Sequence, residues 1–287
     1  MEEFWMNMLF AFLMLFTSWY YVPVESPSLP AEVKSIDLKL KRNELAITFF
    51  SLQEGESALI QHPDGENILI NTGGEGSGEE LSRLLGLYNV EQISTIIMTE
   101  EDANSMENAG SIIREFGVKQ LVAGQGLARK RMEELEEFDE VNIHIWGAGT
   151  KQQLFHNLKA EVLFENENPK EGMDLELTLM KHKVLLLNSS SLDAEKALLK
   201  KNLSDVNIVK MPGFGQGNSV SGQLIKHLDP QIAVIFQSRK VKPDEDLFKM
   251  LHEAWIDVYY TGVHGTVTIK FTDLNYEVIT ISPGEAG

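Results

Sequence analysis

The sequence contains no cysteine among its 287 residues. Disulfides, a thiolate nucleophile and cysteine-ligated zinc or iron–sulfur sites are therefore excluded. This absence suits an exported chain without disulfides as well as a cytoplasmic one. The cysteine count therefore does not fix the compartment.

Positive charge is also scarce, with 25 Lys and Arg residues against 43 Asp and Glu residues and a net charge of −18. Sequence-independent binding to nucleic acid depends on basic side chains that neutralise phosphates. The acidic balance argues against nucleic acid as a partner and against attraction of the folded body to anionic lipid. A hydrophobic share of 43% and a charged share of 24% indicate an ordinary globular chain.

The N-terminal segment Phe4–Val22 carries no charged residue and has the length that a helix needs to span a bilayer. Trp5 at one end and Trp19 to Tyr21 at the other match the aromatic belts of two membrane interfaces. A cleaved signal peptide is the alternative, but no Lys or Arg precedes the segment and no small-x-small site follows it. We predict a membrane anchor or uncleaved signal over residues 1–23, in a single-pass protein of the cell membrane.

Residues 24–43 are predicted to be a linker, because "PVESPSLPAEVK" (Pro23–Lys34) is rich in proline and serine. Lys34, Lys39, Lys41 and Arg42 follow the apolar segment, which by the positive-inside rule favours a cytoplasmic body. Long domains cross membranes largely regardless of such charges, so the side of the membrane stays open.

From Leu45 onward the pattern is globular. The β-rich runs "LAITFFSL", "SALIQH" and "NILIN" are separated by turn residues, and "GEELSRLLGLY" (78–88) has helical spacing. Strands and helices then alternate, with short strands at "VNIHIW", "AEVLFE", "LELTLM" and "KVLLLN" and final strands at "IDVYYT", "GTVTIKF" and "YEVITI". The further expected strands are Ile93–Met98, Gln120–Ala123, Val206–Met211 and Ile232–Phe236, and the expected helices are Met106–Phe116, Leu127–Phe138, Asp193–Asn202, Val220–His227 and Glu245–Ala254. This order predicts two packed sheets with helices outside.

The order of motifs from Leu45 to Phe271 resembles the metallo-β-lactamase-like domain of bacterial DNA-uptake (competence) channel proteins. "SLQEGES" matches the family's D-V-G-Q-G-D-S, and "PDGENILINTGG" matches its hairpin and I-L-I-D-T-G-G. "KMPGFGQGNS" matches K-V-P-H-H-G-x-x-N-S, and "VYYTGVHGTVTI" matches the closing motif. The resemblance implies an α/β (α+β) fold, a four-layer αββα sandwich over residues 44–287, preceded here by one N-terminal transmembrane helix. By analogy with the family, the soluble domain would be extracytoplasmic.

Family enzymes bind one or two metal ions through T-H-x-D-x-D-H at a strand tip, and the metal activates a water molecule. Aligning Thr99 with the Thr of that motif places Glu100 and Ser105 at its histidines, while the strand-end Asp has become Asn71. The family's His-His pair becomes Gly-Phe, its bridging Asp falls among Asn and Ser residues, and a lone His aligns with the active-site rim. These degenerate pocket positions are Asn71, Glu100, Asp102, Asn104, Ser105, Asn188, Ser190, Gly213, Phe214 and His264.

Of the ligand-bearing carboxylates that the resemblance implies, Asp102 alone survives. Glu100, Asp102 and Asn104 could offer oxygens to a single weakly bound divalent cation. The interpretation we favour is a solvated acidic turn in which Asn104 or Ser105 caps the following helix. We therefore expect no catalytic residue, no metal and no other cofactor.

Other motifs fail on inspection. "AGQGLARK" lacks the third glycine of a dinucleotide fingerprint, and "PGFGQGNS" lacks the G-K-[ST] of a phosphate loop. "GNSVSG" misses the G-x-S-x-G of a nucleophile elbow, so Ser219 is expected to cap the following helix instead.

The favoured hypothesis is a membrane-anchored pseudoenzyme that acts as a binding or accessory module. Its partner would be a protein or small-molecule ligand whose identity the sequence does not give. The first alternative is a metal-dependent hydrolase with an oxygen-rich site around Asp102. The second alternative is an accessory that handles DNA at the cell surface, which the acidic charge disfavours.

Overall fold

A computed structural model describes residues 35–100, 105–165, 171–217 and 219–282. The predicted anchor at Phe4–Val22 and two predicted pocket residues, Asp102 and Asn104, lie outside these ranges. Within the described ranges, no helix combines the length and the apolar character that crossing a membrane requires.

Two mixed sheets form the centre of the fold. The eight-stranded sheet has the order β15-β14-β1-β2-β3-β4-β5-β6, and β3 to β6 are parallel. Its strands are β1 (Leu45–Phe49), β2 (Ala58–Gln61), β3 (Asn67–Ile70), β4 (Thr95–Met98), β5 (Gln120–Gly124), β6 (Asn142–Trp146), β14 (Thr266–Phe271) and β15 (Tyr276–Ile281).

The seven-stranded sheet has the order β13-β12-β11-β10-β9-β8-β7, and β10 to β13 are parallel. Its strands are β7 (Lys151–Phe155), β8 (Leu158–Phe164), β9 (Asp174–Leu179), β10 (His182–Leu186), β11 (Val206–Lys210), β12 (Ile232–Ile235) and β13 (Asp257–Tyr260). Within each sheet the parallel strands run in the same direction, so their carboxyl ends lie along the same side of that sheet.

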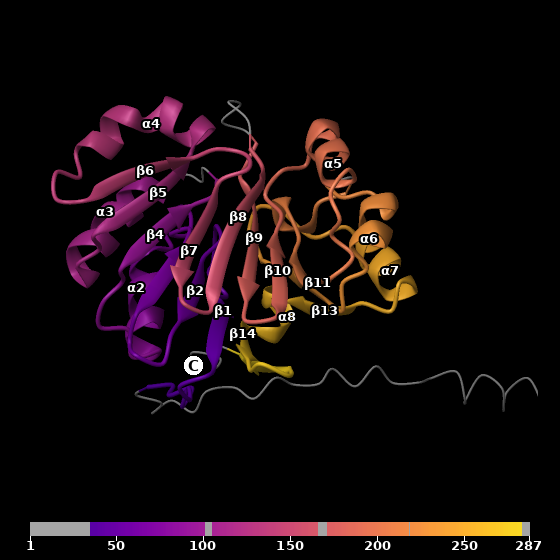
Figure 1. Cartoon of the computed structure of the whole chain (residues 1–287), viewed down its shortest axis with the longest axis horizontal. Helices are drawn as coiled ribbons and strands as arrows, with labels where there is room; N and C mark the ends of the chain where they lie inside the picture. Colours follow the sequence, from indigo (N-terminus) through magenta and orange to yellow (C-terminus); the bar gives the residue numbers. More distant parts are fainter. Residues whose placement is uncertain (1–34, 101–104, 166–170, 218, 283–287) are drawn as a thin grey trace, which may run out of the picture.

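The two sheets face each other across one apolar core, and helices cover their outer faces (Figure 1). A second core lies under α2 (Gly78–Leu87), α3 (Ser105–Phe116) and α4 (Gln125–Glu136). A third lies under α5 (Leu192–Leu198), α6 (Gly222–Leu228) and α7 (Glu245–Glu253), and the short α8 (Thr261–His264) joins β13 to β14. The expected mixed α/β sandwich of two sheets with outer helices is confirmed.

Coverage on both faces explains why the central strands read as unbroken apolar runs. All four residues of β3, of β4 and of β12 are buried. The predicted helix at 78–88 likewise buries Leu81, Leu84 and Leu85 on one face.

Local differences from the expectations have simple causes. β7 has no predicted counterpart, because "KQQLF" is an edge strand whose first three residues are exposed. The capping prediction for Ser219 is wrong: Ser221 caps α6, and its Oγ accepts a hydrogen bond from the Leu224 amide at 3.1 Å. Ile36, which falls in the predicted linker, packs against the domain and donates its backbone N–H to Leu87 at 2.6 Å.

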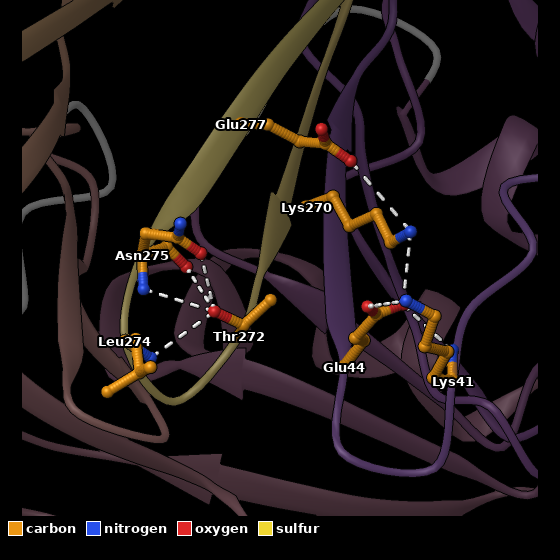
Figure 2. A network of polar contacts seen from close by, with 7 residues as sticks. All are labelled: Lys41, Glu44, Lys270, Thr272, Leu274, Asn275 and Glu277. Atoms are coloured by element: carbon orange, nitrogen blue, oxygen red, sulfur yellow. Dashed lines mark hydrogen bonds and ion pairs between the residues drawn. The ribbon is translucent and has the colours of Figure 1, made fainter.

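A polar network fastens the start of β1 to β14 and β15 (Figure 2). The Lys270 ammonium lies 3.0 Å from Glu44 and 3.8 Å from Glu277, and the Lys41 ammonium lies 3.7 Å from Glu44. Burial acts to raise the pKa of Glu44, but the Lys41 amide and the Lys270 ammonium lower it below its usual value. Beside this network, Thr272 Oγ1 accepts hydrogen bonds that close the β14–β15 turn.

The loop "EGE" between β1 and β2 packs directly against the glycine loop after β3. The Gly74 amide donates to the Glu54 carbonyl at 2.9 Å, and the Gly73 amide donates to the Glu56 carbonyl at 2.9 Å. Gly55 has a φ of +77°, and a Cβ there would lie 2.0 Å from the Gly74 nitrogen. This close approach requires glycine.

We expect Gly55→Ala to lower the free energy of unfolding by about 3 kcal/mol or more, because two backbone segments must separate. Gly65→Ala is the matched control: its φ is +89°, but nothing lies within 4 Å of an added Cβ. That change should cost only about 1 kcal/mol, from the left-handed backbone. Urea unfolding of both variants measures the difference, and equal losses would contradict the packing argument.

Candidate functional site

The candidate site lies where the parallel strands of both sheets end. A small cavity of about 10 Å³ lies between the ends of β3, β4, β10 and β11 and the β1–β2 loop. This volume has room for about one water molecule. The polar residues that line it include Glu56, Asn71, Thr99, Asn188 and Lys210.

A buried ion pair joins the two sheets at this cavity. Lys210, at the end of β11, places its ammonium against Glu56 from the β1–β2 loop, with side chains 3% and 2% exposed. The same ammonium donates a hydrogen bond to Asn188 Oδ1 at 2.6 Å. Burial acts to lower the pKa of Lys210, but the carboxyl groups of Glu56 and Glu100 raise it above its usual value. Lys210 therefore stays charged at neutral pH.

The structure corrects the expectation that Glu100 belongs to a solvated turn. The residue as a whole is half-buried, but its carboxyl oxygen Oε1 is buried, and its carboxyl group lies beside that of Glu56. Burial raises the pKa of Glu100 to about 8, and the neighbouring Glu56 carboxylate adds to the rise. Glu100 is therefore largely protonated at neutral pH, which the sequence pattern did not indicate.

Asp174, at the start of β9, is a further buried acid that the sequence analysis missed. It accepts hydrogen bonds at Oδ1 from the amides of Asn188 at 2.7 Å and Ser189 at 2.9 Å. Burial raises the pKa of Asp174 to about 7, although these amides and Lys210 act against the rise. Its only sequence signal is an acid at the start of an otherwise apolar strand, "DLELTL".

Asn71 and Asn188 act as connectors between strand ends. Asn71 donates from Nδ2 to Thr99 Oγ1 at 2.8 Å and accepts at Oδ1 from the Thr99 amide at 2.7 Å. Its φ of 58° lies in the left-handed region, which asparagine tolerates better than most residues. Asn188 donates from Nδ2 to the Met173 carbonyl at 2.7 Å while it accepts from Lys210.

The remaining predicted positions fall at different places. Ser190 is exposed, and Phe214 is half-buried and packs against the core between the sheets. Ser105 is buried at the start of α3, where its hydroxyl has no hydrogen-bond partner within the described ranges, so it does not act as the expected cap there. His264 ends α8: its Nδ1 accepts from the Tyr260 amide at 3.1 Å, and its ring packs on Tyr259. This agrees with a structural histidine in a turn.

These side chains do not fit a metal ion. Gly213 and Phe214, which align with the family's histidine pair, offer no side-chain donor. Among the described residues, no group of three or more His, Asp or Glu side chains could hold a metal.

Comparisons with known proteins identify the fold. No family model matches the sequence, and no curated protein matches it. In contrast, several solved structures superimpose on most of the chain. The metallo-β-lactamase fold protein YhfI from Bacillus subtilis is 12% identical, with a TM-score of 0.57 over 78% of this chain and 99% of that chain.

Two hydrolases give similar values. Igni18, described as a novel metallo hydrolase from the archaeon Ignicoccus hospitalis, is 12% identical, with a TM-score of 0.56 over 79% of this chain and 100% of that chain. A diphosphatase from the PhnP family is 15% identical, with a TM-score of 0.55 over 79% and 98%. At these identities the likeness shows the fold alone. The chain has the metallo-β-lactamase fold, while its relation to competence channels stays a prediction.

We expect Lys210→Met to lower the free energy of unfolding by about 3–5 kcal/mol, because it leaves the buried Glu56 carboxylate without its cation. Adding Glu56→Gln in the same chain should restore part of that loss. Lys151→Met is the control, since Lys151 pairs with Glu161 at 2.9 Å but is 71% exposed. That pair should contribute at most about 1 kcal/mol. If Lys210→Met lowered the free energy of unfolding no more than Lys151→Met, the buried pair would not be stabilising.

We expect the protein to become less stable as the pH rises toward 8. The pKa of Glu100 rises from 4.5 to about 8, and that of Asp174 rises from 3.8 to about 7. The folded state therefore binds more protons than the unfolded chain. The stabilisation from these two groups is complete below their ordinary pKa values and is lost as the pH rises through the folded-state pKa values. Glu100→Gln should flatten the fall in urea midpoint between about pH 5 and pH 8. An unchanged slope would show that Glu100 does not titrate in this range.

Proposed function

We propose that this chain is a catalytically inactive metallo-β-lactamase-fold protein, anchored in the cell membrane, that acts as a binding or accessory module. Its ligand would be a partner protein or a small molecule. The fold is that of metal-dependent hydrolases, but Gly213 and Phe214 stand where the resembling family has its histidine pair, and Asn71 stands at its strand-end Asp. The proposal rests on this loss of metal-binding side chains.

The single observation that carries the proposal is the Gly213–Phe214 pair, which follows β11 and offers no side-chain ligand where the family motif has two histidines. The Lys210–Glu56 contact explains why the surrounding frame persists, because its partners come from two of the four matching motifs, "SLQEGES" and "KMPGFGQGNS". The contact between the two sheets gives these motif residues a structural role. The motifs can therefore persist in a protein without catalytic activity, because the same residues are needed for stability.

A metal-dependent hydrolase around Asp102 remains the second candidate. It is favoured by the hydrolase descriptions of two structural neighbours, and Asp102 itself lies outside the described residues. Handling of DNA is less favoured, because the net charge is −18.

Metal content and turnover of the purified full-length chain test the proposal. After incubation with Zn²⁺, Mn²⁺ or Ca²⁺ and dialysis, we expect mass spectrometry to find well below one metal ion per chain. Hydrolysis of phosphodiester and ester substrates should not exceed the rate in buffer. Asp102→Ala should behave like the unchanged chain and like Asp139→Ala, an exposed-acid control.

The opposite result is equally specific. One bound metal ion per chain, with turnover that Asp102→Ala abolishes and Asp139→Ala preserves, would establish the hydrolase and overturn the pseudoenzyme. Metal binding without turnover would show a structural cation and would overturn only the statement that the site holds no metal.

A further inference from the structure

The end of the sandwich opposite the site, here called the distal end, is built from turns. It contains residues 62–66 between β2 and β3, residues 156–157 between β7 and β8, residues 180–181 between β9 and β10, residues 272–275 between β14 and β15, and residues 255–256 before β13. The arrowheads of β7 and β9 point toward this end in Figure 1. It lies away from the site because the parallel strands begin here and end at the cavity.

Two large apolar side chains are fully displayed at the distal end. Trp255 is 93% exposed and Leu274 is 88% exposed, the highest values for large hydrophobic residues in the described part of the chain. Trp255 also has a φ of 60°, an unfavourable conformation for a bulky residue. Exposed apolar groups of this size mark surfaces that contact another apolar phase.

The two residues lie on adjacent corners of the two sheets. Tyr276, which follows the Leu274 turn, donates its hydroxyl to Gln231 Oε1. The Gln231 carbonyl in turn accepts from the Asp257 amide at 3.0 Å, two residues after Trp255. Leu274 and Trp255 therefore flank one polar contact between the sheets.

The described chain also enters at the distal end. The Ile36 amide donates a hydrogen bond to the Leu87 carbonyl, and Glu44 forms an ion pair with Lys270 beside the β14–β15 turn (Figure 2). Before this point the sequence has the uncharged apolar segment Phe4–Val22 and 12 residues, 23–34. Twelve residues span at most about 40 Å. An anchor in the bilayer would therefore keep the distal end close to the membrane surface.

Charge at the distal end is mixed. Exposed Lys39, Arg42 and Lys181 lie there, but so do exposed Asp64 and Asp273. Electrostatic attraction to anionic lipid is therefore weak, and contact depends on the apolar side chains. Tryptophan is favoured at the interface between lipid headgroups and acyl chains, where its ring is partly buried and its N–H stays hydrated.

We propose that the distal end rests on the surface of a phospholipid bilayer, with Trp255 and Leu274 in the interfacial zone. Zwitterionic phosphatidylcholine is sufficient as the partner. The inference rests on the membrane anchor of the proposed function and adds an orientation to it. The cavity end then faces away from the membrane, where a soluble partner can reach it.

The absence of native cysteine makes a direct test possible, because one introduced cysteine can be labelled alone. Full-length Trp255→Cys and Leu274→Cys chains are labelled with a fluorophore and reconstituted into phosphatidylcholine vesicles. Some of the lipid carries a quencher near the headgroup end of its acyl chain. Leu192→Cys is the matched control, since Leu192 is 74% exposed at the start of α5, at the cavity end.

Insertion of about 5–10 Å should quench the labels at positions 255 and 274 at least about twofold more than the label at position 192. Equal quenching at all three positions, in chains that float with the vesicles, would overturn the docked orientation while leaving the anchor intact. Chains that fail to float with the vesicles would overturn both the anchor and the docking. Repeating the experiment with anionic phosphatidylglycerol distinguishes apolar contact from electrostatic attraction. Quenching that occurs only with the anionic lipid would overturn the proposal that Trp255 and Leu274 make the contact through apolar insertion.

Discussion

The buried contact between the Lys210 ammonium and the Glu56 carboxylate is the constraint on which the candidate site depends. Each partner comes from a different sheet, so the pair forms only when the sandwich is closed. Removing two charges from water is costly, and their attraction offsets that cost only when other hydrogen bonds satisfy the remaining atoms. Asn188 fulfils this condition for the ammonium, because its Oδ1 accepts from Lys210 while its backbone amide donates to Asp174 Oδ1 at the start of β9.

The carboxyl groups around that pair outnumber the positive charges. Glu56, Glu100 and Asp174 surround a single ammonium, so three full negative charges would leave the interior with excess charge. The raised pKa values of Glu100 and Asp174 resolve the excess by protonation. Among the described residues, protons and one lysine therefore balance the carboxyl groups at this end of the sandwich.

The sequence predicted the fold well and the site poorly, for different physical reasons. Strands such as Thr95–Met98 are buried on both faces, so their apolar runs and the turn residues between them are visible locally. The Lys210–Glu56 contact and the buried state of Asp174 depend on how the sheets meet, which no local pattern records. Glu100 was expected to be solvated because acidic turns usually are, and tertiary packing reversed that expectation.

The two ends of the sandwich differ because the parallel strands all begin at one end and finish at the other. Polar side chains that follow the strand ends, such as Asn71 and Asn188, converge at the cavity, where the loops are long enough to carry several functional groups. The opposite end is made mainly of short turns, carries the ion pairs of Lys270 with Glu44 and Glu277, and exposes Trp255 and Leu274. In the proposed orientation the turn end would rest on lipid and the cavity end would face away from it, so a ligand at the cavity end would not obstruct the contact with the membrane.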